Sequence, residues 1–330
     1  MNKATEKKER GIKIKYTAVF LFLLVALVAG LSLGTEFYSL RRLLHLTDID
    51  KMILFNIRGP RVLAAFIIGA GLSITGAVLQ AILKNPLAES YTLGISGGAS
   101  LGIAMGVILG KTALTPYFAF FGALISVFIV ILSSIKKRFS NSTVILLGVA
   151  LNFLFSSLVL FIVTVVKNQQ FQATMLRIIG DISYFPINLL YGCLITITVI
   201  SLFLILSGKV YDVISIGDEK AASIGINIER EKKIALILCC VITGLCVSLG
   251  GIIGFIGLVV PHITRFFFGP SHKKALTVNF IAGGSFLILA DTLARTLIKP
   301  LEIPVGVITG FFGGIFFLSI LLRGKYMEMW

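Results

Sequence analysis

The segment Ser207–Lys233, SGKVYDVISIGDEKAASIGINIEREKK, is the longest charged stretch in the interior of an otherwise apolar sequence. The chain before it, from Tyr16, and the chain after it, to Leu322, consist of apolar runs separated by short polar breaks. Runs of this kind are typical of membrane-spanning helices. The segment therefore divides the chain into two hydrophobic halves and lies outside the membrane between them.

The central segment also has a helical pattern of its own. Asp218, Ala221, Ala222 and Gly225 recur at steps of three and four, and Ala, Glu and Lys, which favour helices, are frequent in it. Two interpretations are open from composition alone. The segment is either a short helix in water on which another protein docks, or a solvated loop with no further role, which is the usual case for a charged run.

The composition indicates an integral membrane protein. Of the 330 residues, 57% are hydrophobic and 14% are charged, whereas soluble domains have about 25% charged residues. The formal net charge of +15 does not indicate nucleic-acid binding, because the sequence has no polar domain on which basic residues could cluster. Lys and Arg accumulate instead in the cytoplasmic loops of multi-pass membrane proteins, where they set the orientation.

Residues 1–15 form a basic N-terminal tail, and an apolar run from Thr17 to Leu33 follows it. The run is long for the apolar core of a secretory signal, and no convincing small-residue cleavage site comes after it. We therefore expect a retained first span with the N-terminus in the cytoplasm.

Crossing the hydrocarbon core of a bilayer takes about 20 apolar residues. The sequence predicts ten spans, at residues 17–34, 61–83, 92–110, 115–135, 143–166, 187–206, 234–253, 255–269, 275–297 and 304–322. The eighth is short, and only glycines separate it from the seventh. The expected fold is an all-α integral membrane protein with about ten transmembrane helices, one domain over residues 1–330 and both termini in the cytoplasm.

Spans two to five and spans seven to ten enter the membrane from opposite sides, with the sixth span and the central segment between them. Two groups of four spans in opposite orientation predict inverted four-helix repeats, a common arrangement in transporters. The sequences of the two halves are too different to establish the repeat by themselves.

Most Lys and Arg lie on the cytoplasmic side in this topology, but two groups lie on the outer side, before the second span and between the ninth and tenth spans: Arg41, Arg42, Lys51, Arg58, Arg61, Arg295 and Lys299. Orientation rules disfavour arginines at the outer side. They either bind an acidic partner or an anionic ligand, or they reach the membrane interface from helix ends, as long basic side chains do.

Glycines are frequent in the spans, where small residues let helix backbones approach closely. Gly94, Gly97 and Gly98 near one span end, and Gly254 and Gly257 near another, lie where irregular backbone is tolerated only if it is buried or lines a cavity. We expect them to pack helices or to line a pathway.

The sequence lacks the convergent groups that catalysis needs. His262 stands alone, His45 and His272 fall in different loops, and no HExxH, GxSxG or P-loop pattern is present. Four cysteines occur in apolar runs without CxxC spacing and are expected to be core residues: Cys193, Cys239, Cys240 and Cys246.

The main alternative from another class is an ion-coupled secondary transporter. Such a protein needs acids at mid-membrane, and the expected spans are almost free of them. Asp291 and Glu302 flank Arg295 and are expected to pair with it or to cap helices. Because no nucleotide-binding motif is present, the energy for transport has to come from another chain.

Several blocks of the sequence resemble, in order, the FecCD-type permeases of ABC importers, which import iron siderophores, haem and vitamin B12. The resemblance covers about Arg58 to Arg323, and NPLAE and FIGLVVPHITR are its most specific blocks. The matching blocks are RGPRVLAAFIIGAGLSITGAVLQAILKNPLAES, LGISGGASLG, GDEKAASIGIN, GGIIGFIGLVVPHITRFFFG, ADTLART and EIPVGVITGFFG.

The resemblance implies a permease of the type II, vitamin B12 importer-like class in the cell membrane. It would work as a dimer with an identical or paralogous second protomer, with the pathway between the two. Two cytoplasmic ATPase subunits, which use ATP and Mg²⁺, and an extracytoplasmic substrate-binding lipoprotein complete the assembly. This chain itself would bind no cofactor or metal and would not be an enzyme. Its leading substrate class is an iron-siderophore complex, with haem or cobalamin as alternatives.

The family also implies residue roles. In the family, the loop between the sixth and seventh spans docks on the ATPase. The family's outer arginines, which pair with acids of the binding protein, correspond to Arg58, Arg61 and Arg295. The ATPase-coupling residues would be Asp218, Glu219, Ala221, Ala222, Ser223 and Gly225. The residues of the pathway or its packing would be Asn85, Pro86, Gly94, Gly97, Gly98, Gly254, Gly257 and Pro261.

The sequence departs from the family at two places. Ile315 follows a glycine pair where the family often has Gly-Ala-Pro, and the segment around Arg177 lacks the Trp that the family commonly has near the outer short helix. Arg177 therefore places a charge near the expected entrance.

Overall fold

The computed structural model describes residues 3–34, 38, 47–137, 140–165, 175, 178–182, 185–217, 221, 223 and 225–322. Every regular element within these ranges is helical. The helices are α1 (Lys3–Ser32), α3 (Asp48–Ile53), α4 (Gly59–Leu83), α5 (Ile95–Ile108), α6 (Thr115–Lys137), α7 (Asn141–Val165), α9 (Ile187–Leu206), α10 (Gly208–Ile216), α12 (Ile228–Gly250), α13 (Ile256–Phe268), α14 (His272–Thr296) and α15 (Val305–Leu322). A π-helical turn covers Leu54–Arg58, and a 3₁₀ turn covers Thr112–Leu114.

Helices occupy the positions of the ten predicted spans, so the all-α membrane fold is confirmed. In the described part of the chain, 7 helical stretches are long and apolar enough to cross a membrane, and α5, α13 and α15 are shorter apolar helices. The predicted eighth span is α13, with 13 residues. At 1.5 Å per residue it measures about 20 Å, less than the roughly 30 Å of hydrocarbon.

The second span begins earlier than predicted. Helical backbone continues from Asp48 through the π-helical turn into α4, so the helix extends the expected 61–83 span at its N-terminal side. Its start is fixed by a capping box, in which Thr47 Oγ1 accepts from Asp50 N at 3.2 Å and Asp50 Oδ2 accepts from Thr47 N at 3.1 Å. The polar residues before Arg61 suggested a loop, but this cap lets them begin a helix.

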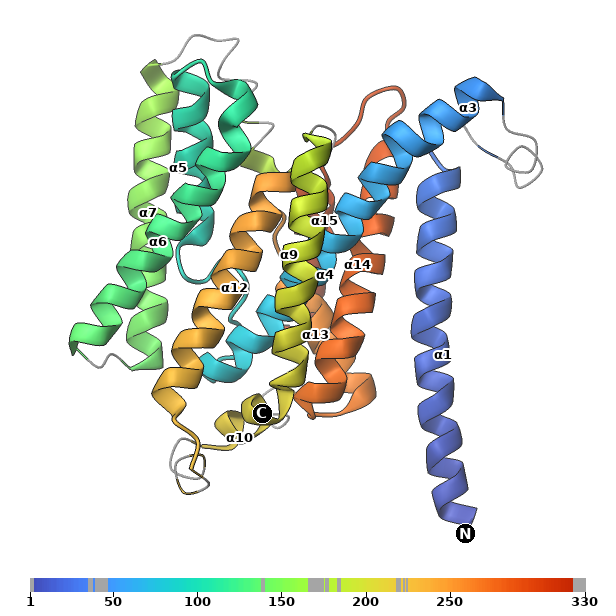
Figure 1. Cartoon of the computed structure of the whole chain (residues 1–330), viewed down its shortest axis with the longest axis vertical. Helices are drawn as coiled ribbons and strands as arrows, with labels where there is room; N and C mark the ends of the chain where they lie inside the picture. The colour runs from blue at the N-terminus through green and yellow to red at the C-terminus, as the bar shows by residue number, and fades with distance from the viewer. Residues whose placement is uncertain are drawn as a thin grey trace.

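Two irregular segments lie inside the bundle, each before a short helix. Residues 84–94 connect α4 to α5, and residues 251–255 connect α12 to α13 (Figure 1). Tyr91 and Ile253, one in each segment, are buried. Irregular backbone within a membrane protein has to find its hydrogen-bond partners inside the protein, so the polar groups of these segments have to be paired within the chain.

Helix packing follows the predicted inverted repeat. The contact of α4 with α14 corresponds to the contact of α12 with α6. The contacts of α5 with α6 and α7 likewise correspond to the contacts of α13 with α14 and α15. These contacts relate the group α4–α7 to the group α12–α15. α9 lies between the two groups and packs on α4 and α12.

The centre of the fold is α4, which is buried along most of its length. Glycines make this possible, because a Cβ on Gly69 would clash with the backbone of Gly283 in α14, and a Cβ on Gly76 would clash with the backbone of Gly257 in α13. Helices in lipid associate through close packing of this kind. The four cysteines are free and buried, as predicted.

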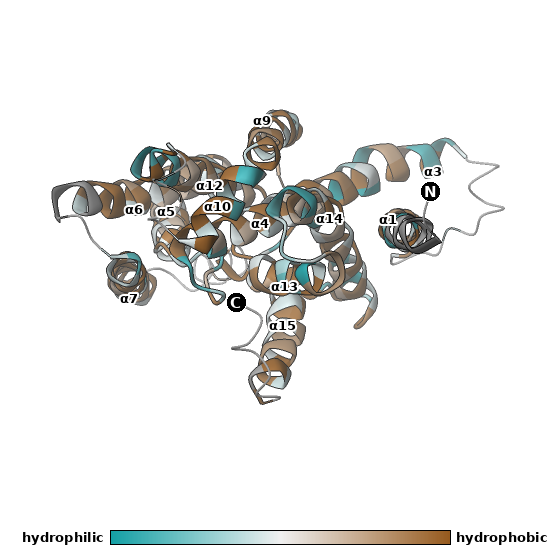
Figure 2. Cartoon of the chain, turned by 90° about the horizontal axis from the view of Figure 1, so that it is seen from below, coloured by the Kyte–Doolittle hydropathy of each residue, from teal (hydrophilic) through white to brown (hydrophobic). Residues whose placement is uncertain are grey.

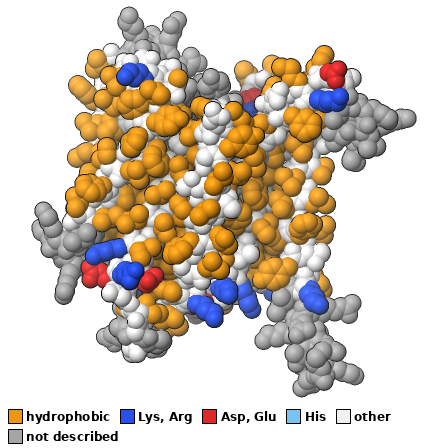
Figure 3. Space-filling model, in the orientation of Figure 1, with side chains coloured by type: hydrophobic (Ala, Val, Ile, Leu, Met, Phe, Trp, Pro, Cys, Tyr) orange, Lys and Arg blue, Asp and Glu red, His pale blue; other side chains and the backbone are white. Residues whose placement is uncertain are grey.

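Apolar side chains form a wide belt on the face shown in Figure 3, and the coloured charged groups lie towards its two ends. Figure 2 shows the molecule from the end at which α10 lies, where hydrophilic residues gather around α10 and the adjoining helix ends, and α7 and α15 stand at the periphery. An apolar belt between two polar ends is the pattern of a multi-pass membrane protein.

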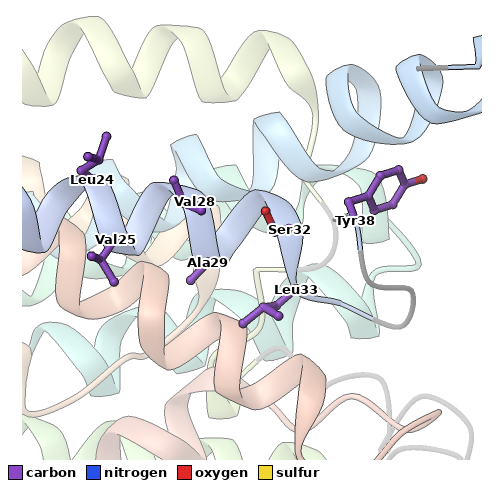
Figure 4. Close-up of a pocket in the computed structure, with 7 residues that line it drawn as sticks. All are labelled: Leu24, Val25, Val28, Ala29, Ser32, Leu33 and Tyr38. Carbon is purple, nitrogen blue, oxygen red and sulfur yellow. The ribbon is translucent and has the colours of Figure 1, made fainter. Parts of the chain in front are cut away.

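Helix α1 stands at one side of the bundle and packs mainly on α14. Near its N-terminal end, Lys15 Nζ donates to Phe267 O, close to the C-terminus of α13, at 2.6 Å. Near its other end, a cavity of about 390 Å³ is lined by Leu24, Val25, Val28, Ala29, Ser32, Leu33 and Tyr38 (Figure 4). Apart from Ser32 and the hydroxyl of Tyr38 this lining is apolar, as expected of a groove open to lipid.

Candidate functional site

An ionic cluster of three arginines and two acids lies at the N-terminal end of α4 and the C-terminal end of α14, and it is called the outer cluster because the sequence predicts it on the outer side. It is formed by Arg58, Arg61, Asp291, Arg295 and Glu302. Arg61 donates to both carboxylate oxygens of Asp291 at 3.0–3.2 Å and to Glu302 Oε2 at 2.7 Å. The side chain of Arg61 is 12% exposed and that of Asp291 is 1% exposed. A forked arginine–carboxylate pair with little water around it is a strong and directional contact.

Arg295 lies one turn after Asp291 in α14 and shares its carboxylate. Arg295 Nε is 3.0 Å from Asp291 Oδ2, and Arg295 Nη2 donates to Gly30 O of α1 at 3.1 Å. The predicted pairing of Asp291 with Arg295 is therefore confirmed. Glu302 pairs with Arg61 instead, because the guanidinium of Arg295 is directed towards α1.

Arg58 has a different environment from the other two arginines. Its Nη1 donates to Leu31 O at 2.8 Å and to Ser32 O at 3.2 Å, the last carbonyls of α1. Its guanidinium carbon lies 4.5 Å from the centre of the Tyr38 ring. Cations are favoured both at helix C-termini and over aromatic faces, so Arg58 stabilises the end of α1.

The structure thus brings the three predicted docking arginines together around a cavity of about 240 Å³. Three arginines and two carboxylates leave one formal positive charge in the outer cluster. Each arginine has partners within the chain, which the orientation rule alone could not reveal. Glu302, with 39% of its side chain exposed, is more accessible than Asp291.

At the centre of the molecule the two irregular segments are joined by hydrogen bonds. Ile253 N donates to Tyr91 Oη at 3.1 Å, and Phe255 N donates to Glu89 Oε2 at 3.4 Å. Phe255 has a left-handed φ of 68° and is the N-cap of α13, so the Glu89 carboxylate lies at the positive end of that helix. Sequence reasoning missed both Glu89 and Tyr91, although the NPLAE block and the residues after it contain them.

Asn85 and Pro86, predicted at the pathway, form the turn that follows α4. Lys84 ends the helix in the left-handed region at φ 50°, and Asn85 Oδ1 accepts from Leu87 N at 2.9 Å. An Asn side chain that accepts from the backbone two residues later stabilises such a turn. These residues direct the chain back into the bundle.

The predicted glycines have distinct surroundings. Gly94 has φ 80° and is the N-cap of α5, a conformation that glycine adopts without strain. Gly97 packs against α7, Gly98 against α6 and Gly257 against α4, each with no room for a side chain. A Cβ on Gly254 would meet nothing within 4 Å, so Gly254 is the position of this set with open space beside it.

Pro261 is buried within α13. Its carbonyl accepts from Thr264 Oγ1 at 3.0 Å, and the same hydroxyl contacts Asn279 Oδ1 of α14. The position of Pro261 is therefore internal, between α13 and α14.

The central segment is partly described. Asp218, Glu219 and Ala222 lie outside the described residues, as does Arg177 near the entrance predicted from the family. Ala221 is fully buried and its N–H donates to Gly217 O at 3.1 Å, whereas Ser223 and Gly225 are exposed. The helix with described bounds, α10, precedes the predicted helical pattern, and Ala221 and Ser223 within that pattern are themselves helical. Of the small residues predicted to face a partner, Ala221 is buried and Gly225 is exposed in the single chain.

Asp212 of α10 contacts the start of α14, an interaction that the sequence did not suggest. Its Oδ1 accepts from His272 N at 2.5 Å and lies 2.8 Å from His272 Nδ1, and Ser271 Oγ is 3.4 Å from Oδ2. Partial burial would raise the pKa of Asp212, but the hydrogen bonds from His272 and Ser271 outweigh it and hold the pKa below its ordinary value. His272, expected to be an isolated loop residue, is thus part of a side-chain pair.

Residues 21–323 match the model of the FecCD transport family. The chain is 30% identical over 327 residues to the iron(3+)-hydroxamate import system permease protein FhuG of Bacillus subtilis, over 94% of this chain and 97% of that protein. It is 34% identical over 316 residues to the hemin transport system permease protein HmuU of Yersinia pestis, over 92% and 94% of the two chains. It is 32% identical over 309 residues to the vitamin B12 import system permease protein BtuC of Pectobacterium atrosepticum, over 92% of each.

A solved structure has the same fold. It is described as a metal-chelate type ABC transporter in an inward-facing conformation, and it aligns with a TM-score of 0.86 over 93% of this chain and 98% of that chain, at 24% identity. The family match extends over both inverted repeats and over the outer cluster, the two irregular segments and α10. The chain is therefore a member of the FecCD transport family.

Proposed function

We propose that this chain is the membrane-spanning permease subunit of an ABC importer that carries an iron-siderophore complex inward. The observation that carries the proposal is the match over more than nine-tenths of both chains to the permease protein of an iron(3+)-hydroxamate import system. Haem and cobalamin are the alternative substrates, supported by similar matches to permease proteins of hemin transport and vitamin B12 import.

The energy comes from a separate ATPase that docks on residues 207–233. This segment follows α9, and α10 within it lies at the polar end of the bundle (Figure 2). We place this end in the cytoplasm, together with residues 1–15 and the C-terminus, because the basic tail and the basic residues at the start of α14 lie there. ATP and Mg²⁺ are used by the ATPase, and this chain supplies the moving helices.

The binding protein docks at the outer cluster. An acidic residue of that protein would replace Glu302 as a partner of Arg61, because Glu302 is half-exposed and its loss leaves Arg61 held by Asp291. A second protomer completes the pathway, which the family resemblance places beside Asn85, Gly254 and Pro261.

An ion-coupled secondary transporter has less support. Asp291, the acid near membrane depth in α14, is fixed between Arg61 and Arg295. Glu89 accepts from the backbone at the start of α13. A carboxylate that relays protons has to change its hydrogen-bond partners, and these contacts hold both carboxylates in place.

The test is uptake by proteoliposomes that contain this chain with its ATPase and binding protein. We expect accumulation of a radiolabelled ferric hydroxamate that requires ATP and the binding protein, and competition with haem and cobalamin ranks the substrate classes. A control with an ATPase that binds but does not hydrolyse ATP should show no accumulation. Uptake driven by a proton gradient with this chain alone would overturn the proposal.

A further inference from the structure

The N-terminus of α14 lacks a cap of its own. Ser271 occupies the N-cap position, but its side chain makes no capping hydrogen bond to the helix, and the first turn contains no acidic residue. Lys273 and Lys274 lie there instead. Basic residues at the positive end of a helix are unfavourable, so this end requires a negative group from elsewhere in the molecule.

Asp212 of α10 supplies that group. Its carboxylate accepts from the backbone N–H of His272, the first residue of α14, and lies within hydrogen-bond distance of the imidazole Nδ1. The side chain of His272 is 7% exposed and that of Asp212 is 31% exposed. Asp212 therefore acts as an N-cap in trans, with His272 as a second point of attachment.

The backbones of the two helices are also in contact. A Cβ on Gly208, the first residue of α10, would lie 2.6 Å from Lys273 Cα. Tyr211 and Ile214 of α10 are buried. Gly208 and Asp212 lie one helical turn apart on the same face of α10, and both contact the first turn of α14.

The same two helices end at the two surfaces on which partners are proposed to dock. α10 continues directly into residues 217–227 of the segment assigned to the ATPase. α14 has 25 residues, which at 1.5 Å each span about 38 Å, and its last two turns carry Asp291 and Arg295 of the outer cluster. One continuous helix therefore connects the Asp212–His272 contact to the outer cluster.

We propose that Asp212 and His272 are positioning residues that transmit movement of the ATPase-docking segment to α14, and through α14 to the outer cluster. The proposal rests on the proposed function, because it assumes an ATPase at residues 207–233 and a binding protein at the outer arginines. It adds that the affinity for the binding protein depends on nucleotide through this contact, which is a coupling between two sites in the thermodynamic sense.

The experiment uses the full transporter in nanodiscs, with its ATPase, and measures the affinity for the binding protein with and without a non-hydrolysable ATP analogue. We expect the wild type to show a nucleotide-dependent change in affinity of roughly fivefold or more. Asp212→Ala should retain co-purification with the ATPase and the nucleotide-free affinity, and the nucleotide-dependent change should fall towards none. A residue with only a structural role would alter the nucleotide-free affinity as well.

A pair of His272 variants gives a second test that does not depend on Asp212→Ala folding. His272→Asn offers an amide N–H close to the position of Nδ1 and should keep most of the nucleotide effect, whereas His272→Ala should lose it. Asp48→Asn, at a 98% exposed side chain on the outer side, is the control and should behave as wild type. Equal nucleotide effects in His272→Asn and His272→Ala would overturn the proposal.

The outcomes also separate this proposal from the function on which it rests. A wild-type chain that co-purifies with no ATPase would overturn the proposed function. A wild-type complex with a nucleotide effect that Asp212→Ala leaves intact would overturn only the transmission role. Loss of ATPase co-purification in a folded Asp212→Ala variant would assign the residue to the docking surface and would also overturn transmission.

Discussion

Arg61 contacts two acids whose surroundings differ, and this difference separates their roles. Asp291 is buried between two guanidinium groups, whereas Glu302 is 39% exposed. Removing one member of a buried ion pair leaves the other charge without compensation, which is costly, whereas an exposed pair contributes little. Asp291 therefore stabilises the fold, and Glu302 is free to exchange.

We expect Asp291→Asn to lower the free energy of unfolding by about 3–5 kcal/mol and Glu302→Gln to lower it by less than about 1 kcal/mol. Both replacements keep the shape of the side chain, so they report on charge. Thermal unfolding of the purified chain in mild detergent measures the difference. Equal losses in the two variants would contradict the assignment.

The contact between Asp212 and His272 makes stability depend on pH. An Asp side chain in an unfolded chain has a pKa of about 3.9, and the folded-state pKa of Asp212 lies below its ordinary value. A depressed folded-state pKa contributes stability that is present above the unfolded value and is lost as the pH falls through the folded value. We expect the difference in melting temperature between wild type and Asp212→Asn to be constant well above pH 4 and to shrink as the pH falls below about 4. A difference that does not change with pH, with Asp48→Asn as the control, would argue against this contact.

Sequence patterns located the three arginines but only part of their surroundings. The orientation bias of Lys and Arg identifies Arg58, Arg61 and Arg295 as exceptions. The positions of Asp291 and Glu302 on either side of Arg295 suggested that they pair with it, which holds for Asp291 alone. The contact of Arg58 with the end of α1 depends on how two distant helices meet, which no local pattern records. The same holds for Asp212 and His272, which are 60 residues apart.

At the scale of helices, the close approach of α4 to α13 and α14 depends on glycine. Gly76 lies against the backbone of Gly257, so a methyl group there has to separate the two helices. Extra volume in a packed interior costs about 1–3 kcal/mol. In an open position, by contrast, Gly→Ala favours the helix by about 1 kcal/mol.

We therefore expect Gly76→Ala to lower the melting temperature of the purified chain. Gly192→Ala is the matched control, because Gly192 lies in α9 and a Cβ there would meet nothing within 4 Å. This control should leave the melting temperature unchanged or raise it. A similar effect of the two substitutions would show that helix propensity, rather than packing between α4 and α13, determines the outcome.

The helices themselves were predictable because long apolar runs report directly on membrane spans. Two features were not. The extension of α4 back to Asp48 was missed because Asp50 and Thr47 are polar, and their capping role becomes evident only when the helix is known to start there. The hydrogen bonds of Glu89 and Tyr91 were missed because the backbone N–H groups that donate to them belong to the other half of the chain.

At the scale of the whole molecule, the bundle has a polar surface at each end. Helix α14 contacts α10 at one end and carries two residues of the outer cluster at the other. The outer cluster carries one formal positive charge when Glu302 is paired. Neutralising Glu302 raises this charge and leaves Arg61 with an unoccupied donor edge, which favours an external carboxylate.

We therefore expect Glu302→Gln to strengthen association with the binding protein by about two- to fivefold and to make it more sensitive to salt. Surface plasmon resonance at two ionic strengths, with the permease in nanodiscs, measures both effects. Asp48→Asn, another acid on the outer side, controls for the change in net charge. Weaker association of Glu302→Gln than of the control would show that Glu302 supports docking rather than competing with it.

The crossing of residues 84–94 with residues 251–255 also has a consequence for how the chain is made. Tyr91 and Glu89 meet their partners across 162 and 166 residues of sequence, so the first repeat enters the membrane before those partners exist. At roughly 5–20 residues per second, synthesis of the missing stretch takes on the order of 10–30 seconds. During this interval Tyr91 and Glu89 lack the backbone partners that they have in the folded chain, so we expect the half-finished chain to be less stable in the membrane than the complete one.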